Sequence, residues 1–219
     1  MNENWNISGL ILEGICGTGK TTLFRSLLQS ERFFQRSFLS AIFLSEHQTQ
    51  RVLERKERET GLTPNDNVGL LDQHVSYLEA VQNRLDQMEW CRNNRTNMRV
   101  PYVLERFHFT HVYHYPHITW EHVEPIDRRL AKLNCKLCLL VIPEELLRKR
   151  IISSRDLAWR DYLKRYGDTD QAILKHYATQ QNMLRGLLAR SALNTLIVDT
   201  GATTIDQSLA RVLDFWGAT

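Results

Sequence analysis

The stretch Gly14-Ile15-Cys16-Gly17-Thr18-Gly19-Lys20-Thr21 decides the fold of this 219-residue chain. It has the spacing of a phosphate-binding loop, in which a glycine and four further residues precede Gly-Lys-Thr. The glycines let backbone N–H groups curl around a phosphate without obstruction from side chains. An apolar run, 7–13, precedes the loop, and a segment with helical spacing, 20–28, follows it. The loop is therefore expected between a strand and a helix, where its mechanism requires it.

The spacing predicts a role for the polar side chains of the loop. We expect Lys20 to reach the β- and γ-phosphate oxygens of a nucleoside triphosphate, and the Thr21 hydroxyl to ligate Mg²⁺. The helix that begins near Gly19 points its positive end at the same phosphates. ATP and Mg²⁺ are therefore the predicted cofactors, and the expected nucleotide-binding residues are Gly14, Gly17, Thr18, Gly19, Lys20, Thr21 and Thr22.

Length and composition fit a single domain spanning 1–219. The apolar fraction of 42% supports a sizeable core, and two independent domains would be cramped. Lys and Arg number 28 against 25 Asp and Glu, so the overall charge does not indicate a polymeric nucleic acid as a partner. No stretch approaches the roughly 20 apolar residues of a membrane helix. The cysteine pattern and a start unlike a signal peptide favour a cytoplasmic protein without a membrane partner.

Apolar runs alternate with helical patterns along the whole chain. We expect strands at 7–13, 38–44, 101–105, 136–142 and 195–199. Helices are expected at 20–28, 51–59, 68–92, 125–133, 144–152, 170–190 and 205–215. This alternation predicts an α/β fold, a three-layer parallel sheet flanked by helices, of the P-loop NTPase type. The segment 153–167 is basic and aromatic and is expected to form a lid, and the long helix 68–92 could supply the face of a homodimer.

The loop and several later motifs resemble the thymidylate kinases and their deoxynucleoside kinase relatives. The most specific of them is 12–23, Leu-Glu-Gly-Ile-Cys-Gly-Thr-Gly-Lys-Thr-Thr-Leu. Ser45-Glu46-His47 and Glu105-Arg106-Phe107 resemble that group's acidic motifs near the ends of the second and third strands. Ile197-Val198-Asp199-Thr200-Gly201 resembles the strand and loop that pass beside the adenine. The resemblance implies an ATP-dependent kinase, in which Thr200 and Gly201 contact the nucleotide.

Three charged side chains at strand ends are candidate catalytic residues. Glu46 could orient or deprotonate an acceptor hydroxyl, since α/β sheets bind ligands at the carboxyl ends of their strands. Glu105 could hold a water of the Mg²⁺ shell or assist the same acceptor. Arg106 offers a planar fork that suits a phosphate or a sugar hydroxyl. The structural alternatives are a solvated carboxylate at Glu46, a pairing of Glu105 with Arg106, and a surface salt bridge of Arg106.

The lid segment carries many cations and few residues that would hold it in place. We expect Arg155 and Arg160 to stabilise the transition state, because Arg148 and Arg150 fall on the preceding helix. A lid of this kind excludes water, so that transfer outcompetes hydrolysis. The alternative is a charged run that simply faces solvent.

Five histidines lie between residues 107 and 122, at positions His108, His111, His114, His117 and His122. The first four recur at every third residue, a spacing that drifts around a helix, and no cysteine or carboxylate nearby completes a set of zinc ligands. With the aromatic residues among them, they are expected to line an acceptor pocket or to pack partly into the core. Cys135 and Cys138 have no second pair and are expected in the core.

The leading hypothesis is an ATP-dependent kinase for a small-molecule acceptor, with a nucleoside or nucleotide favoured. Thymidylate kinases often carry a carboxylate in or beside the loop at the position of Cys16, and its replacement argues against thymidylate as the acceptor. A nucleotide-binding regulatory ATPase or switch is disfavoured by the arginine-bearing lid and by the lack of an Asn-Lys-x-Asp guanine motif. A kinase for an antibiotic, a sugar or a cofactor precursor stays open, because unlike segments assemble the acceptor pocket.

Overall fold

The computed structural model describes residues 6–34, 40–95, 99–154 and 156–217. These residues contain a five-stranded parallel sheet with the strand order β2-β3-β1-β4-β5. Its strands are β1 (Ile7–Glu13), β2 (Ile42–Leu44), β3 (Val100–Glu105), β4 (Cys135–Val141) and β5 (Asn194–Asp199). The central strand β1 pairs with β3 and β4, and the phosphate loop follows its carboxyl end.

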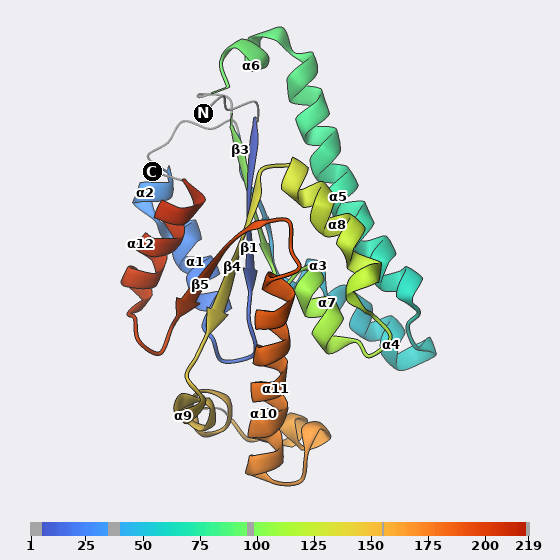
Figure 1. Ribbon diagram of the computed structural model, residues 1–219, viewed down its shortest axis with the longest axis vertical. Coiled ribbons are helices and arrows are strands. Elements are labelled where there is room, and N and C mark those ends of the chain that lie inside the picture. Colours follow the sequence, from blue (N-terminus) through green and yellow to red (C-terminus); the bar gives the residue numbers. More distant parts are fainter. Residues whose placement is uncertain (1–5, 35–39, 96–98, 155, 218–219) are drawn as a thin grey trace.

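Helices cover both faces of the sheet (Figure 1). One face carries α1 (Lys20–Gln29), α2 (Glu31–Phe34) and α12 (Ile205–Trp216). The other carries α5 (Pro64–Gln87), α7 (His108–His114), α8 (Trp120–Lys132) and α11 (Asp170–Leu188). Alternate residues of β1 join different cores: Leu10 and Leu12 join that of α1 and α12, whereas Ile7 and Ile11 join that of α5 and α8. The predicted three-layer α/β architecture is confirmed.

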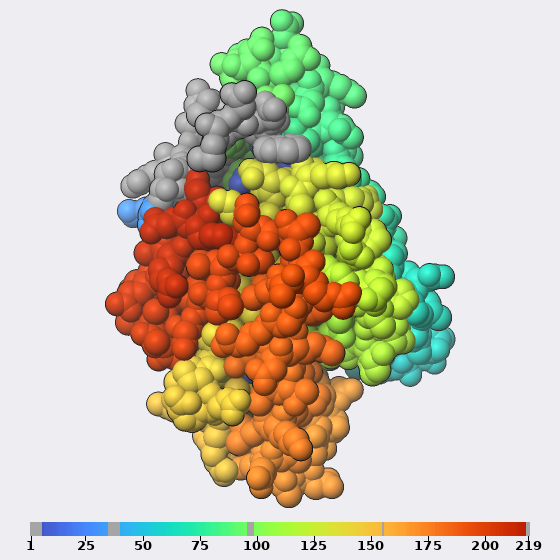
Figure 2. Space-filling model, in the orientation of Figure 1, coloured from blue at the N-terminus to red at the C-terminus, as the bar shows by residue number. Residues whose placement is uncertain are grey.

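Two further groups of short helices gather at the end of the molecule toward which the strands run (Figure 1). After β2 come α3 (Glu46–Thr49), the 3-10 turn η1 (Arg51–Leu53) and α4 (Glu54–Thr60). After β4 come α9 (Glu144–Leu147), the π-helical η2 (Arg148–Ser153), α10 (Leu157–Leu163) and η3 (Lys164–Tyr166). The segment from α9 to α11 forms the lower end of the space-filling view (Figure 2). Both groups therefore flank the sheet edge where ligands bind in α/β proteins.

The long helix expected at 68–92 differs from its predicted bounds at both ends. It begins at Pro64, because Thr63 and Asp66 form a capping box ahead of it and proline is well suited to a first helical position. It ends at Gln87, since Met88 is extended (φ −87°, ψ 108°) and a separate short helix, α6 (Glu89–Asn93), follows. No helix within the described ranges combines the length and apolar character needed to cross a membrane. The dimer face on α5 stays a prediction.

Three other elements also differ from their expected ranges. The helix expected at 125–133 begins at Trp120, because Thr119 and His122 form a capping box outside the apolar pattern, and Pro125 lies inside the helix. The strand expected at 38–44 is limited to β2, and residues 38 and 39 lie outside the described residues. The helix expected at 144–152 changes to π-helical hydrogen bonding at Arg148. Such changes of helix type often occur at functional sites.

Candidate active site

Three glycines with positive φ shape the phosphate loop. Gly14, Gly17 and Gly19 have φ values of 143°, 82° and 88°, in the region that favours glycine. A Cβ on Gly14 would lie 2.4 Å from the carbonyl oxygen of Leu140 in β4, so this close approach also requires glycine. Gly19 is the N-cap of α1, which begins at Lys20. The loop therefore places backbone N–H groups and a helix amino terminus around one anion-binding point.

The Lys20 side chain is held inside this loop. It is 3% exposed, and its Nζ donates to the carbonyl oxygen of Ile15 at 2.7 Å. Burial, together with the charge of Arg106, lowers the pKa of Lys20 to about 7. The two carboxylates Glu105 and Glu46 oppose this shift. A phosphate bound in the loop would favour the protonated ammonium in the same way, since an opposite charge nearby stabilises the charged form.

Thr21 and Glu105 bring together oxygen atoms of the kind that Mg²⁺ binds. The Thr21 hydroxyl donates to Glu105 Oε1 at 2.6 Å, and Glu105, which ends β3, is 1% exposed. Hydroxyl and carboxylate oxygens suit Mg²⁺, which usually keeps several waters and binds through few protein groups. Among the described residues, no three His, Cys, Asp or Glu side chains converge as a metal site. The residues thus fit an ion that Thr21 ligates directly and Glu105 through water, with phosphates among its other ligands.

Glu46 and Arg106 form a half-buried ion pair beside this point. Arg106 Nε donates to Glu46 Oε2 at 2.6 Å, and its NH1 donates to the Tyr113 hydroxyl at 2.7 Å. Arg51 lies 3.7 Å from the other Glu46 oxygen. Burial would raise the pKa of Glu46, but Arg106 and Lys20 outweigh it and hold the pKa below its ordinary value. Glu46 is therefore an ionised, oriented carboxylate, and Arg106 pairs with it and not with Glu105.

Sequence reasoning gave no role to Glu13, which ends β1. Its buried carboxylate accepts hydrogen bonds from the backbone N–H groups of Phe107 and Thr110, at 2.8 and 3.1 Å, and from the Thr110 hydroxyl at 2.6 Å. These bonds tie the central strand to the start of α7 and to the turn after Arg106, whose φ is 54°. The one feature of the sequence that could have indicated this role is the position of Glu13, a carboxylate at the end of an apolar strand.

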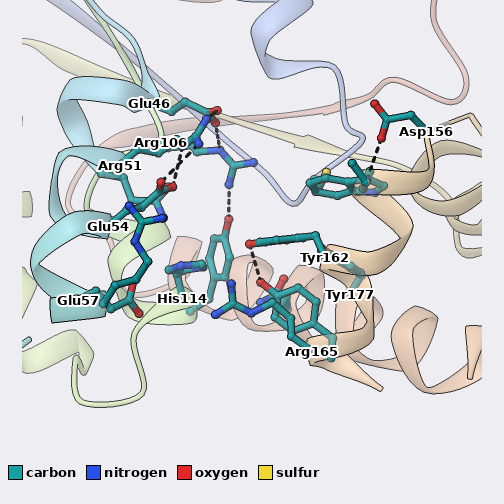
Figure 3. A pocket seen from close by; sticks show the side chains of 18 residues that line it. Glu46, Arg51, Glu54, Glu57, Arg106, His114, Asp156, Tyr162, Arg165 and Tyr177 are labelled. Atoms are coloured by element: carbon teal, nitrogen blue, oxygen red, sulfur yellow. Dashed lines mark hydrogen bonds and ion pairs between the residues drawn. The ribbon is translucent and has the colours of Figure 1, made fainter. Parts of the chain in front are cut away.

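A cavity of about 920 Å³ opens beside the phosphate loop, between two walls (Figure 3). One wall comes from α3, η1 and α4, the other from the start of α10 to α11, and α7 also contributes. Cys16 and Arg106 border the loop side. The lining includes Glu46, Arg51, Glu54, Glu57 and Arg58 on the first wall, Trp159, Tyr162, Arg165, Tyr166 and Tyr177 on the second, and Tyr113 and His114 from α7.

The two walls differ in chemistry. On the first wall, Arg51 Nε donates to Glu54 Oε1 at 2.6 Å, so the segment that the sequence presents as a charged exposed helix forms ion pairs along the cavity. On the second wall the rings of Trp159 and Tyr162 stack, with centroids 5.0 Å apart. The hydroxyls of Tyr162 and Tyr166 lie 3.1 Å apart. One wall is therefore ionic and the other largely aromatic.

The loop after β5 is tied to the phosphate loop, and its predicted contact with the nucleotide stays a prediction. The Thr200 hydroxyl donates to the carbonyl oxygen of Thr18 at 2.9 Å. Arg150 donates to the Thr200 carbonyl oxygen at 3.1 Å, and its own carbonyl oxygen would lie 3.1 Å from a Cβ on Gly17. Gly201 follows Thr200 in this loop. Thr22, the last of the predicted nucleotide-binding residues of the phosphate loop, lies exposed in the first turn of α1.

The structure describes one of the two lid arginines chosen from the sequence. Arg155 lies outside the described residues. Arg160 lies exposed on α10 and does not line the cavity, whereas Arg165, which the sequence did not single out, does. The periodicity of a short charged segment does not indicate which of its arginines turns inward.

The histidines of α7 and the following turn find separate partners. His108 pairs with Asp127 at 2.9 Å, and His111 with the Thr49 carbonyl oxygen at 2.9 Å, both in the core. His117 bonds to Asn67, whereas His114 lines the cavity. Of the two predicted alternatives, packing into the core holds for His108 and His111, and the role of the cavity as an acceptor pocket stays a prediction. Cys135 and Cys138 are buried, as predicted, and belong to the cores on opposite faces of the sheet.

Comparisons with known proteins add the fold class. No protein-family model matches the chain, and no curated protein does so. A crystal structure of the YorR protein from Bacillus subtilis, in complex with phosphorylated GDP, is similar with a TM-score of 0.55 and 14% identity over 94% of each chain. A gluconokinase from Sinorhizobium meliloti 1021 is similar with a TM-score of 0.51 and 12% identity, covering 96% of this chain and 91% of the gluconokinase. The chain has the α/β fold of P-loop NTPases, and identities this low establish the fold alone.

Proposed function

We propose that this protein is an ATP-dependent kinase that transfers the γ-phosphate to a small molecule, with a nucleoside or nucleotide as the favoured acceptor. The observation that carries the proposal is that Lys20, Glu105 and Glu46 converge where the phosphate loop meets the large cavity. The similar structures, a gluconokinase and a protein bound to phosphorylated GDP, support small-molecule phosphoryl transfer on this fold.

In this proposal the phosphate loop and Lys20 hold the β- and γ-phosphates of ATP. Thr21 and Glu105 would hold Mg²⁺, which when bound neutralises charge on these phosphates. The Glu46 carboxylate takes the proton of the acceptor hydroxyl while the hydroxyl oxygen bonds to the γ-phosphorus. The bond between this phosphorus and the bridging oxygen breaks, and ADP leaves. Arg106 keeps Glu46 oriented through their 2.6 Å hydrogen bond.

The lid arginines remain part of the proposal. Arg160 is exposed on α10, and its proposed role requires a movement of α10 that brings it to the transferred phosphate. Arg155, at the start of the same segment, is proposed for the same role. Closure of this kind would exclude water from the γ-phosphate.

The cavity favours a kinase over a regulatory ATPase or switch, because a switch has no second small molecule to bind beside the loop. A sugar, antibiotic or cofactor precursor as acceptor is compatible with the same transfer machinery. A cytoplasmic location, a homodimer built on α5 and a single domain over 1–219 accompany this proposal.

The test has two stages. Calorimetry of the folded protein with MgATP is expected to show binding. ATP labelled on the γ-phosphate is then offered with nucleosides, nucleotides, sugars and antibiotics, and transfer of label to one of them is expected. A folded protein that does not bind MgATP would overturn the proposal. MgATP binding and hydrolysis without transfer to any acceptor would favour the switch.

A further inference from the structure

The cavity contains a second pair of polar side chains, Arg165 and His114, besides those assigned to phosphoryl transfer. In the close-up both side chains lie below Glu46 (Figure 3). The charges of Arg106 and Arg165 both act on His114, which indicates that His114 is close to each of them. Nothing in the proposed phosphoryl transfer uses either side chain.

Arg165 keeps its hydrogen-bond donors available. Its guanidinium lies over the rings of Tyr162 and Tyr166, 5.0 and 5.5 Å from their centroids, and forms no hydrogen bond or ion pair within the described residues. In contrast, Arg51 and Arg106, the arginines nearer Glu46, are bound to carboxylates. A guanidinium stacked on aromatic rings is held in orientation while its N–H groups stay able to donate.

His114 is an uncharged partner for the same ligand. Burial, assisted by the charges of Arg106 and Arg165, lowers the pKa of His114 to about 4, so at neutral pH it offers one donor and one acceptor. Its ring contacts those of Tyr113 and Tyr115 and makes no hydrogen bond within the described part of the chain. Both nitrogen atoms thus retain unused hydrogen-bonding capacity.

We propose that Arg165 and His114 bind the ring of a planar heteroaromatic acceptor and favour rings that carry an exocyclic carbonyl oxygen. This inference rests on the proposed kinase function and narrows its acceptor. The surrounding tyrosines, Tyr113, Tyr162, Tyr166 and Tyr177, supply aromatic surface for such a ring. Arginine donates and cannot accept, so it selects a carbonyl oxygen over an amino group at the ring edge.

The balance of charge around the cavity favours a neutral carbonyl group over an anion as the ligand of Arg165. Among the described residues that line it, carboxylates and guanidinium groups are equal in number: Glu46, Glu54, Glu57 and Asp156 against Arg51, Arg58, Arg106 and Arg165. An anionic group of the acceptor would therefore find no excess of positive charge. A single guanidinium is sufficient to bind a neutral carbonyl oxygen, whereas a phosphate is generally bound by several cations or N–H groups.

Two pairs of nucleosides test the proposal, because each pair differs by a carbonyl and an amino group at one ring position: uridine with cytidine, and inosine with adenosine. We expect the wild-type protein to favour uridine and inosine in kcat/KM by roughly ten- to hundredfold, the range of a hydrogen bond to a charged group. Arg165→Ala should bring both ratios close to one by raising the KM of the carbonyl-bearing nucleoside. The kcat and the affinity for MgATP should change little. His114→Ala should act in the same direction with a smaller effect.

Lys164→Ala is the matched control. Lys164 is the preceding residue, carries the same charge, pairs with Asp161 and does not line the cavity, so both ratios should persist. Ratios that survive Arg165→Ala would overturn the inference, as would wild-type protein that neither binds nor phosphorylates any of the four nucleosides. If such protein phosphorylates another acceptor, the kinase proposal stands without the inference. Loss of sugar-acid or phosphate-ester binding in Arg165→Ala would instead identify an anion subsite, and absent MgATP binding refutes the kinase proposal itself.

Discussion

The phosphate loop and the cavity beside it are built in opposite ways. The loop is eight consecutive residues, and its shape is fixed by positive-φ glycines and by close backbone contacts, such as that of Gly14 with Leu140. The cavity draws its lining from segments between Cys16 and Gln180 that depend on long-range packing to meet. In the proposed function, the loop would determine the class of chemistry and the cavity would determine the acceptor.

The largest effect is expected from Lys20→Ala, which removes the central cation of the loop. Transfer should fall by about a thousandfold or more, because charge on the moving phosphoryl group loses its main protein partner. The fold should persist, since the substitution also removes a buried amine whose charged form is disfavoured by desolvation. Steady-state kinetics and a thermal melt measure both outcomes. Lys175→Ala, an exposed change on α11, is the control. Transfer close to the wild-type rate in Lys20→Ala would refute the role given to the loop.

Glu46→Gln should slow transfer to the acceptor without weakening MgATP binding. A neutral hydroxyl acceptor needs its proton removed, so transfer should slow by roughly a hundred- to ten-thousandfold, while MgATP affinity stays unchanged. Glutamine keeps the size of the side chain and can still accept a hydrogen bond from Arg106. Titrations of MgATP binding and of acceptor-dependent ADP formation on both proteins separate the two effects.

The size of this loss also reports on the acceptor. A phosphate monoester is already ionised near neutral pH and needs no base. With such an acceptor, the loss of activity in Glu46→Gln should be smaller and should appear mainly as a higher KM. Equal rates in wild type and Glu46→Gln would remove Glu46 from the mechanism and leave Glu105, whose carboxylate lies 3.4 Å from the Glu46 backbone nitrogen, as the candidate base.

The difference between the two regions explains how much the sequence could predict. The strand, loop and helix around Lys20 follow from spacing and periodicity, which act over a few residues. Glu46 and Arg106 were individually identified because each follows a strand, and the parallel sheet brings strand ends together. The helix starts at Pro64 and Trp120 were missed because polar caps set them, outside the apolar pattern.

The lining of the cavity was less predictable, because it depends on how helices far apart in the sequence pack together. Arg51 and Glu54 have the spacing of a solvated helix, and nothing local shows that a second wall faces them. Arg160 was chosen and Arg165 was overlooked, because the sequence does not show which side of the segment faces the cavity. That property depends on long-range packing, such as the contacts of Tyr166 in η3 with His176 and Tyr177 in α11. Glu13 binds residues almost a hundred positions away, which no local pattern reveals.

The smallest predicted effect concerns the proton on Lys20. Its pKa of about 7 lies below the ordinary 10.5, so the ligand-free protein has about half of this amine neutral at pH 7 and about nine-tenths neutral at pH 8. Phosphates bound in the loop should restore the charge. MgATP binding is therefore expected to take up close to one proton at pH 8 and only about a tenth of one at pH 6.

Calorimetry in buffers of different ionisation enthalpy measures this uptake. Protons exchanged by ATP itself are common to wild type and Lys20→Ala, so the difference between the two proteins isolates the lysine. The same shift affects stability with a defined sign: between pH 7 and 10.5 the unfolded chain binds more protons at Lys20 than the folded protein, so this group makes stability rise with pH in that window. Lys20→Ala should lose that rise. Proton uptake that is equal at pH 6 and 8, or unchanged by Lys20→Ala, would show that the lysine is already charged in the empty loop. The lowered pKa of Lys20 would then be refuted.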